Sequence, residues 1–341
     1  MSKKVLSFGE LLLRICPDAG GDWLKENTLP FYVGGAEANV ATALALWGIP
    51  SAYFTALPDN MLAHQLAAYL EEKGIDASKI LFQGGRLGLY FLPKGKDVKN
   101  AGVIYDRDHS SFSALLPGTI DWDGVLEGIG WLHFSAISPA LNRHAAKVCE
   151  EMLQAAGKRG ITISVDLNYR PKLWQYGVDP VEVMPGLVQH CDLVMGNLWA
   201  AEKMLGIPVD GDLVAADRKE DYLEHARRTS EQIVSRFPRV KQVAKTFRFD
   251  RMGSGIHYYT TLYTDKTLYS SDEYFSDKIL DKVGSGDCFM AGLIKGLYWQ
   301  QPVRETLEFA TAAAFQKLFI PSDATNQRVE DIQKFMATYE R

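Results

Sequence analysis

The chain has 341 residues, with 37 Lys and Arg against 42 Asp and Glu, so its formal net charge is −5. At about 100–200 residues per domain, this length predicts two domains or one large α/β domain with an appendage. The acidic balance argues against a general nucleic-acid-binding protein, which needs a basic face. The four cysteines are far apart and form no CxxC pair, so they indicate neither a zinc site nor a disulfide framework.

No apolar stretch reaches the roughly 18 continuous residues that a membrane span needs. The apolar run near the N-terminus is interrupted by Glu10, and no small-residue cleavage site follows it. This pattern favours a first core strand over a signal peptide. We therefore expect a cytoplasmic protein that does not bind a membrane.

Strand-like and helix-like segments alternate in the N-terminal part of the chain. Short strands are predicted at Val5–Phe8 and Ser51–Ala56, because these segments are apolar and brief. Helices are predicted at Ala36–Trp47 and Asn60–Lys73, and a glycine follows each of them, as is common at helix ends.

The same alternation returns in the second half of the chain. The further predicted elements are strands Gly130–Ser135, Ile161–Leu167, Asp192–Met195, Val240–Phe247, Gly255–Tyr263 and Thr267–Ser271, and helices Arg143–Arg159, Leu198–Leu205, Asp217–Arg236, Asp287–Trp299 and Val303–Phe319. Strands that alternate with helices predict an α/β fold with a mostly parallel sheet covered on both faces.

Two segments, residues 11–33 and 84–112, lack helical periodicity and are rich in strand-forming residues, Gly and Pro. Within the second, RLGLYFLPKG and GVIYDRD are typical of antiparallel strands. Loops of this length without secondary structure are uncommon in compact domains. We therefore expect one α/β domain over residues 1–341, with a small β appendage built from these two insertions.

The most distinctive motif is DKVGSGDCFMAG at residues 281–292. Small residues at Gly284, Ser285 and Gly286 let backbone N–H groups gather around one point, and a helix that begins near Asp287 adds its positive dipole end. Such an anion hole stabilises a phosphoryl group in transfer, and Asp287 could accept a proton from the attacking hydroxyl. The alternative is that Asp287 only caps the helix.

A second motif, GGAEAN at residues 34–39, opens a helix of small residues. Gly34 and Gly35 allow a ligand to approach the backbone, and Asn39 offers both a donor and an acceptor to a polyol. Tight helix–sheet packing would explain the alanines that follow but explains Asn39 poorly.

The P-loop, GxGxxG, HExxH and GxSxG motifs are absent, and the histidines show no metal-ligand spacing, so no metal-ligating cluster is predicted.

The two motifs, in this order and at this separation, resemble the paired signatures of the ribokinase (PfkB-type) carbohydrate kinases. The resemblance covers nearly the whole chain and implies a ribokinase-like three-layer α/β/α domain whose β insertions, 11–33 and 84–112, form a lid. It also implies transfer of the γ-phosphoryl group of ATP to a sugar hydroxyl, aided by Mg²⁺. In this reading Asp287 is the general base, and Gly284, Ser285 and Gly286 hold the phosphoryl group.

Within the family the chain is most similar to the 2-keto-3-deoxygluconate kinases, through GLYFL at 88–92, YDR at 105–107, DLNYR at 166–170 and SD at 322–323. The resemblance implies that the sugar acid contacts Gly34, Tyr90, Tyr105, Arg107, Arg170 and Asp323. Arginines bind carboxylates through paired hydrogen bonds, and a 2-keto acid presents a carboxylate.

The nucleotide side departs from the family pattern at two places. The resemblance implies contacts with ATP and its ion at Asn168, Asn197, Thr246 and Arg248. However, the family's Asn-x-x-Glu motif ends here in Ala200, which should weaken the outer hold on Mg²⁺ by about 10–100-fold. The segment 245–253 also has Arg248 where the family pattern has its first glycine, and this arginine either contacts the ATP phosphates or is solvated.

Two rival functions follow from the same residues. A fructokinase, or another kinase of neutral ketoses, would share DLNYR but would give Tyr105 and Arg107 no carboxylate to bind. Ala200 and the altered 245–253 segment would also suit a catalytically weak sugar-binding protein, although it would have no need of Asp287.

The strands Leu89–Leu92 and Val103–Tyr105 would expose apolar edges, and relatives pair through their lids, so we expect a homodimer.

Overall fold

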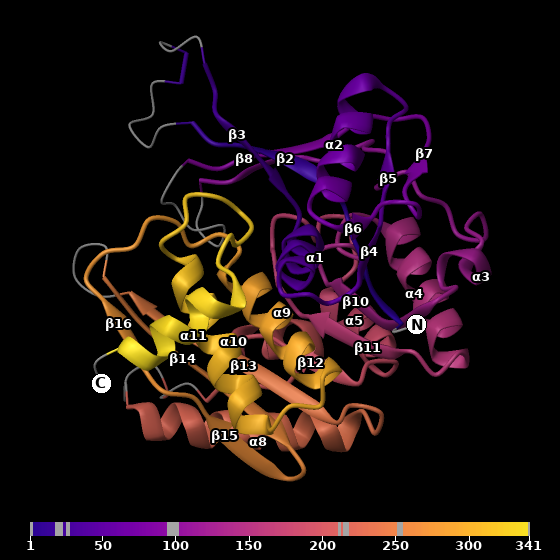
Figure 1. The fold of residues 1–341 in the computed structure, drawn as a ribbon. Helices are drawn as coiled ribbons and strands as arrows, with labels where there is room; N and C mark the ends of the chain where they lie inside the picture. The colour runs from indigo at the N-terminus through magenta and orange to yellow at the C-terminus, as the bar shows by residue number, and fades with distance from the viewer. Residues whose placement is uncertain are drawn as a thin grey trace.

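The computed structural model describes residues 3–17, 23–24, 28–93, 102–210, 213, 218–250 and 255–339. A large sheet is covered by helices on both faces, and a small separate sheet lies at one end of the molecule (Figure 1). The predicted α/β class is confirmed. Parts of the predicted segments, residues 18–22, 25–27, 94–101, 217 and 251–253, lie outside the described residues. No described helix has the length and apolar character required to cross a membrane.

The large sheet has ten strands and is mostly parallel. Its spatial order is β15 (Thr267–Ser270), β14 (Ile256–Thr264), β13 (Gln242–Asp250), β12 (Leu193–Met195), β11 (Thr162–Asp166), β10 (Ile129–Ser135), β1 (Lys4–Phe8), β4 (Ser51–Phe54) and β6 (Ile75–Asp76), and β16 (Tyr274–Ser276) also pairs with β14. All neighbours from β13 to β6 pair in parallel, whereas β14 pairs antiparallel with β13, β15 and β16.

Helices bury both faces of this sheet. One face packs against α1 (Ala36–Leu46), α9 (Ser285–Tyr298), α10 (Val303–Lys317) and α11 (Val329–Thr338), and the other against α4 (Arg143–Lys158), α5 (Pro180–Val188), α6 (Leu198–Leu205) and α8 (Lys219–Arg236). Along β10, Trp131 packs in the core on the face covered by α1, and Leu132 packs in the core on the opposite face, because successive side chains of a strand point to opposite faces of the sheet. The remaining helices are α2 (Met61–Glu72) and the short α3 (Trp122–Val125).

The small sheet contains β2 (Leu12–Ile15), β3 (Phe31–Gly34), β8 (Gly88–Phe91) and β9 (Ile104–Asp106), in the order β3-β2-β8-β9. It therefore combines residues from both predicted insertions. The expected antiparallel pairing within the second insertion is confirmed, because Tyr90 of β8 faces Tyr105 of β9. The β2 and β8 strands pair in parallel and join the two insertions.

Two differences from the predicted elements have clear physical causes. The strand predicted over 51–56 divides, because β5 (Ala56–Leu57) leaves the large sheet to pair with β7 (Leu81–Phe82). Helix α5 was not predicted, because prolines at 180 and 185 hide its pattern: the first sits at an N-terminal position that tolerates proline, and the second lies inside the helix.

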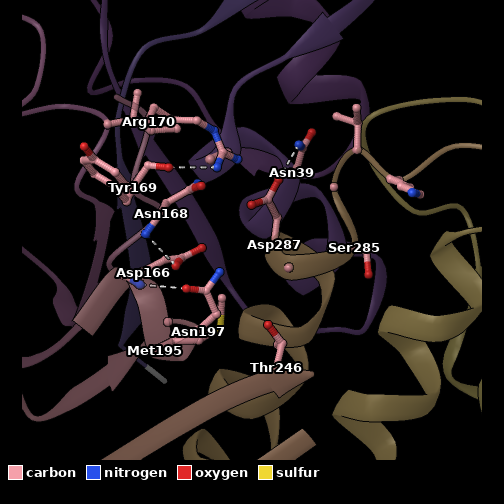
Figure 2. Close-up of a pocket in the computed structure, with 18 of the residues that line it drawn as sticks. Asn39, Asp166, Asn168, Tyr169, Arg170, Met195, Asn197, Thr246, Ser285 and Asp287 are labelled. Carbon is pink, nitrogen blue, oxygen red and sulfur yellow. Dashed lines mark hydrogen bonds between the residues drawn. The ribbon is translucent and has the colours of Figure 1, made fainter. Parts of the chain in front are cut away.

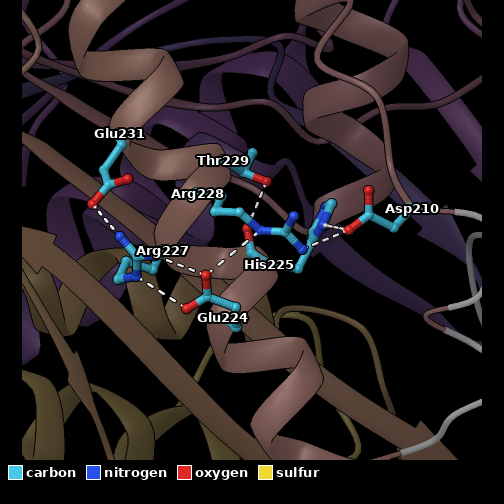
Figure 3. Close-up of polar contacts among 7 residues, drawn as sticks. All are labelled: Asp210, Glu224, His225, Arg227, Arg228, Thr229 and Glu231. Carbon is cyan, nitrogen blue, oxygen red and sulfur yellow. Dashed lines mark hydrogen bonds and ion pairs between the residues drawn. The ribbon is translucent and has the colours of Figure 1, made fainter.

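Helix α8 carries a dense network of surface charges (Figure 3). Arg227 bridges Glu224 and Glu231 on the same helix, which is the spacing that lets side chains meet. Arg228 and His225 both contact Asp210, which lies in the segment before the helix. These contacts hold α8 against the preceding chain and lie outside the site described next.

Candidate active site

A cavity of about 550 Å³ opens where the carboxyl ends of the central strands meet the small sheet. Parallel α/β sheets place ligands at this edge, because the loops that follow the strands converge there. Every predicted site residue except Gly34 lines the cavity: Gly35, Asn39, Tyr90, Tyr105, Arg107, Asn168, Arg170, Asn197, Thr246, Arg248, Gly284, Ser285, Gly286, Asp287 and Asp323. The fold thus brings together residues from both ends of the chain.

The glycine-rich segment forms the N-terminus of α9. Gly284 is the cap residue and has a left-handed backbone, with φ 79°, so the helix begins at Ser285 and not near Asp287 as expected. The Ser285 hydroxyl donates to the Ala314 carbonyl at 3.1 Å and is therefore turned into the fold. The first N–H groups of a helix lack partners within it, so the backbone at this point offers donors to an anion.

Gly284 cannot be replaced without moving the backbone. A Cβ atom there would lie 1.8 Å from the carbonyl oxygen of Asp323. We expect Gly284→Ala to lower Tm far more than Gly206→Ala, because Gly206 has a similar φ of 66° but open space around its Cβ position. Left-handed backbone alone costs about 1–2 kcal/mol for a residue other than glycine. Thermal denaturation of both variants checks this, and equal losses would contradict the close contact.

Asp287 is the third residue of α9 and does not cap the helix, which removes the simplest alternative to a chemical role. Its carboxylate borders the cavity and accepts a hydrogen bond from the Asn39 amide at 2.7 Å (Figure 2). Loss of bulk water around the carboxyl raises its pKa to about 8, with Asp166 and Glu37 adding to the effect and Asn39 opposing it. The group can therefore take up a proton near neutral pH.

The raised pKa of Asp287 predicts a stability difference that depends on pH. Between about pH 4 and pH 8 the unfolded chain releases this proton and the folded chain keeps it, so ionisation increasingly favours unfolding. We expect Asp287→Asn to raise Tm relative to the wild type, by an amount that grows as pH rises through this range. Calorimetry at several pH values measures it, and a difference independent of pH would contradict the raised pKa.

Three carboxylates in the cavity were not predicted as site residues: Glu10, Glu37 and Asp166. Glu37 accepts a hydrogen bond from the Ser135 N–H at 2.9 Å, and burial raises its pKa to about 7. Each belongs to a sequence feature already noted. Glu37 is the acid of GGAEAN, Asp166 is the first residue of DLNYR, and Glu10 interrupts the first apolar run. An acid inside an apolar run was the available signal for Glu10.

The end of the cavity beneath the small sheet holds two arginines. Arg107 is almost fully buried, and its Nε atom lies 2.5 Å from Oε2 of Glu10, so its charge is already paired. Arg170 donates from Nη1 to the Tyr169 carbonyl at 3.2 Å, and within the described residues no carboxylate lies at ion-pair distance from it. This difference between the two arginines was not predicted.

Asp323 and Gly34 lie beside each other at the same end. Asp323 is 1% exposed and accepts hydrogen bonds from Arg14 and from the Tyr90 hydroxyl, at 2.8 and 2.7 Å. A Cβ atom at Gly34 would lie 2.9 Å from the Asp323 carboxylate. Gly34 is thus required for packing against Asp323, and it does not line the cavity as expected for a residue that contacts the sugar.

The opposite end of the cavity contains the residues expected near the nucleotide. Asn197 caps α6, where its side chain accepts from the Ala200 N–H at 2.7 Å (Figure 2). Ala200 is buried, and Glu202 is directed away from the cavity, towards Lys203 and the Val209 N–H. Glu202 therefore does not replace the carboxylate missing at position 200.

Thr246 and Arg248 lie on β13, and Arg248 approaches the carbonyl of Lys282 at 3.5 Å. Asn168 follows β11, where its N–H donates to the Asp166 carboxylate at 3.0 Å. The cavity therefore has an end under the small sheet that holds Arg170 and the Arg107–Glu10 pair, a donor-rich helix terminus with Asp287 in the middle, and a polar end at β12 and β13.

Comparison with known proteins identifies the family of this chain. The pfkB family carbohydrate kinase model matches residues 2–325. A curated 2-dehydro-3-deoxygalactonokinase of Haloferax volcanii is 24% identical over 336 residues, which are 98% of this chain and 97% of the relative.

Solved structures extend the likeness to three dimensions. The 2-dehydro-3-deoxygluconokinase of Thermotoga maritima is 32% identical, with a TM-score of 0.88 over 99% of both chains. A fructokinase of Xylella fastidiosa with bound ATP shares the fold, at 19% identity and a TM-score of 0.75, over 99% of both chains. A family match over nearly the entire sequence thus accompanies an aspartate in the first turn of a helix that borders the cavity, and the chain belongs to the pfkB family of carbohydrate kinases, as a sugar kinase.

Proposed function

We propose that the protein transfers the γ-phosphoryl group of ATP to the 6-hydroxyl of 2-keto-3-deoxy-D-gluconate or a close sugar acid. The observation that carries this proposal is one cavity with Asp287 and the α9 terminus between an end that holds Arg170 and a polar end. The names of the Thermotoga maritima and Haloferax volcanii relatives support a 2-keto-3-deoxy sugar acid. The ATP bound to the Xylella fastidiosa fructokinase supports ATP as the donor.

The reaction needs one proton transfer and one phosphoryl transfer. Asp287 removes the proton of the sugar 6-hydroxyl while the oxygen of that hydroxyl forms a bond to the γ-phosphorus of ATP. The bond between the γ-phosphorus and the oxygen that bridges it to the β-phosphorus breaks, and ADP leaves. The N–H groups at Ser285, Gly286 and Asp287 face the charge that develops on the phosphoryl oxygens. Asn39 holds the Asp287 carboxylate in place through its 2.7 Å hydrogen bond.

Magnesium would be held mainly by the phosphates of ATP. No group of three or more potential metal-ligating side chains occurs in the described residues, which suits an ion that keeps several waters and takes few protein ligands. Asp166 is the carboxylate at the strand edge that could receive such an ion or its waters, and Asn168 and Asn197 flank it. When bound, the ion neutralises phosphate charge in transfer.

The small sheet acts in this proposal as a lid. It supplies Tyr90 and Tyr105, whose ring centroids lie 6.3 Å apart, above the sugar end of the cavity. A covered site excludes water, which would otherwise compete with the sugar hydroxyl for the phosphoryl group.

A kinase of neutral ketoses is the second candidate. The specific observation that favours it is the pairing of Arg107 with Glu10, because this pair leaves Arg170 as the arginine available to a carboxylate at this end of the cavity, within the described residues. The acid proposal therefore depends on Arg170.

The direct test is ADP formation with ATP, Mg²⁺ and 2-keto-3-deoxygluconate, with the position of the new phosphate ester read by ³¹P NMR. An ester at C6 supports the proposal. Sugar-dependent thermal stabilisation without ADP formation would instead support a catalytically weak sugar-binding protein.

We also propose that two copies pair through their small sheets. The edge strands β3 and β9 carry Phe31 and Ile104, which are 57% and 54% exposed. Exposed apolar edge strands tend to pair with another chain. Light scattering at micromolar concentration should give twice the chain mass of 38.0 kDa, and a monomeric mass would contradict the dimer.

A further inference from the structure

Arg14 is a fully buried arginine that lies between the small sheet and the large domain. It is part of β2, and its side chain is 0% exposed. Its Nη1 atom lies 2.8 Å from Asp281 and 2.8 Å from Asp323, and both aspartates are also buried. Burial alone would lower the pKa of Arg14, but the nearby carboxylates outweigh it and raise that pKa, so the guanidinium is charged.

Asp281 connects Arg14 to the anion hole. Its Oδ1 atom accepts a hydrogen bond from the Val283 N–H at 3.0 Å, which fixes the turn directly before Gly284. Its backbone N–H donates to the Leu318 carbonyl at 3.1 Å, which ties this turn to the end of α10. The position of the glycine segment is therefore set by a residue that Arg14 holds.

Asp323 makes the second connection. Its carbonyl oxygen lies against Gly284, since a Cβ atom added to that glycine would be 1.8 Å from this oxygen. Its carboxylate accepts a hydrogen bond from the Tyr90 hydroxyl on the sugar side. Lys317 is a second buried basic residue here, and its Nζ atom donates to the Ile320 carbonyl at 3.1 Å, while burial lowers the pKa of its amine. Arg14 is thus the charged partner of two carboxylates directly behind the anion hole.

We infer that Arg14 is a positioning residue for phosphoryl transfer, which fixes the anion hole relative to the sugar-binding wall through its ion pairs with Asp281 and Asp323. The same pairs hold the carboxylate of Asp323, which also lines the cavity. This inference rests on the proposed roles of the anion hole and Asp287. It does not depend on which sugar is the substrate.

The physical consequence is a loss of turnover that exceeds any loss of affinity. Without Arg14, two buried carboxylates lose the guanidinium that lies 2.8 Å from both, and Asp281, which accepts from the Val283 N–H before Gly284, is no longer held by an ion pair. A displacement of about 1 Å at a reacting centre can cost about 100-fold in rate. Substrate affinity, which depends on many contacts, should change less.

The test compares Arg14→Lys and Arg14→Met with the wild type in kcat and in both KM values, per folded molecule and well below Tm. We expect Arg14→Met to lower kcat about 100-fold while the KM values for ATP and sugar change about threefold or less. Lysine keeps the charge but is shorter and loses the Nε hydrogen bond to the Leu92 carbonyl, so Arg14→Lys should give an intermediate kcat. A kcat of either variant at the wild-type value would overturn the inference.

Asp281→Asn provides a second variant if Arg14→Met does not fold, because the amide keeps the shape of the side chain and its oxygen can still accept from Val283. It should lower kcat with little change in either KM value. Arg239→Met is the matched control, since it removes an arginine–aspartate pair with Asp192 outside the cavity and should leave kcat unchanged. An equal fall of kcat in the control would overturn the inference.

The wild type is assayed first with 2-keto-3-deoxygluconate and fructose, and the variants with whichever sugar it phosphorylates. A preference for fructose would contradict the proposed substrate while leaving the comparison of the Arg14 variants intact.

Discussion

Asp287→Asn is expected to lower kcat by about 10²–10⁴-fold, the contribution of a positioned general base. Asparagine has nearly the same shape and can still accept the hydrogen bond from Asn39, so the binding site should keep its form. It cannot take up the proton of the attacking hydroxyl. The sugar KM should therefore change little, and steady-state kinetics with saturating ATP measures both values.

The pH dependence of the wild type gives a second view of the same group. A base acts when ionised, and the pKa of Asp287 is raised to about 8, so kcat/KM for the free enzyme should rise with pH up to about this value. The control variant is Asp59→Asn, because the Asp59 side chain is 74% exposed and pairs with His64, and neither residue lines the cavity. Near-wild-type turnover of Asp287→Asn would show that the base is another residue.

Arg170→Met is expected to lower kcat/KM for 2-keto-3-deoxygluconate by about 100-fold, since two hydrogen bonds between charged groups contribute about 3 kcal/mol. Arg107 cannot fully compensate, because Glu10 already pairs with it. For fructose, which has no carboxylate, the same substitution should have a much smaller effect. The two kcat/KM values, measured on the same preparation, give the selectivity directly.

Arg239→Met serves as the control for this experiment as well, because its guanidinium pairs with Asp192 and does not line the cavity. If Arg170→Met lowers kcat/KM equally for the acid and for fructose, Arg170 does not recognise the carboxylate. If it changes neither value, the arginine has no part in the site.

Much of the fold follows from local sequence patterns. Apolar strands such as Val5–Phe8 and helices closed by glycine, such as that ending before Gly48, are encoded within a few residues. The antiparallel strands around Tyr90 and Tyr105 are confirmed for the same reason. Helix α5 was missed because Pro185 breaks its pattern.

The site could be predicted where a motif carried it, and not where partners meet only in three dimensions. Asp287 and Asn39 lie 248 positions apart but stand in motifs, and the fold joins them by a hydrogen bond. The Arg107–Glu10 pair and the Arg14 ion pairs depend on how the small sheet packs, which no local pattern reveals. Arginines that appear equivalent in the sequence therefore differ in their availability to a ligand.

The most direct measurement of the central claim is the ratio of kcat/KM for 2-keto-3-deoxygluconate to that for fructose, determined for the wild type with saturating ATP and Mg²⁺. Recognition of the carboxylate by Arg170 predicts a ratio of about 100 or more in favour of the acid. A ratio near or below one would contradict the proposal and identify the protein as a kinase of neutral ketoses.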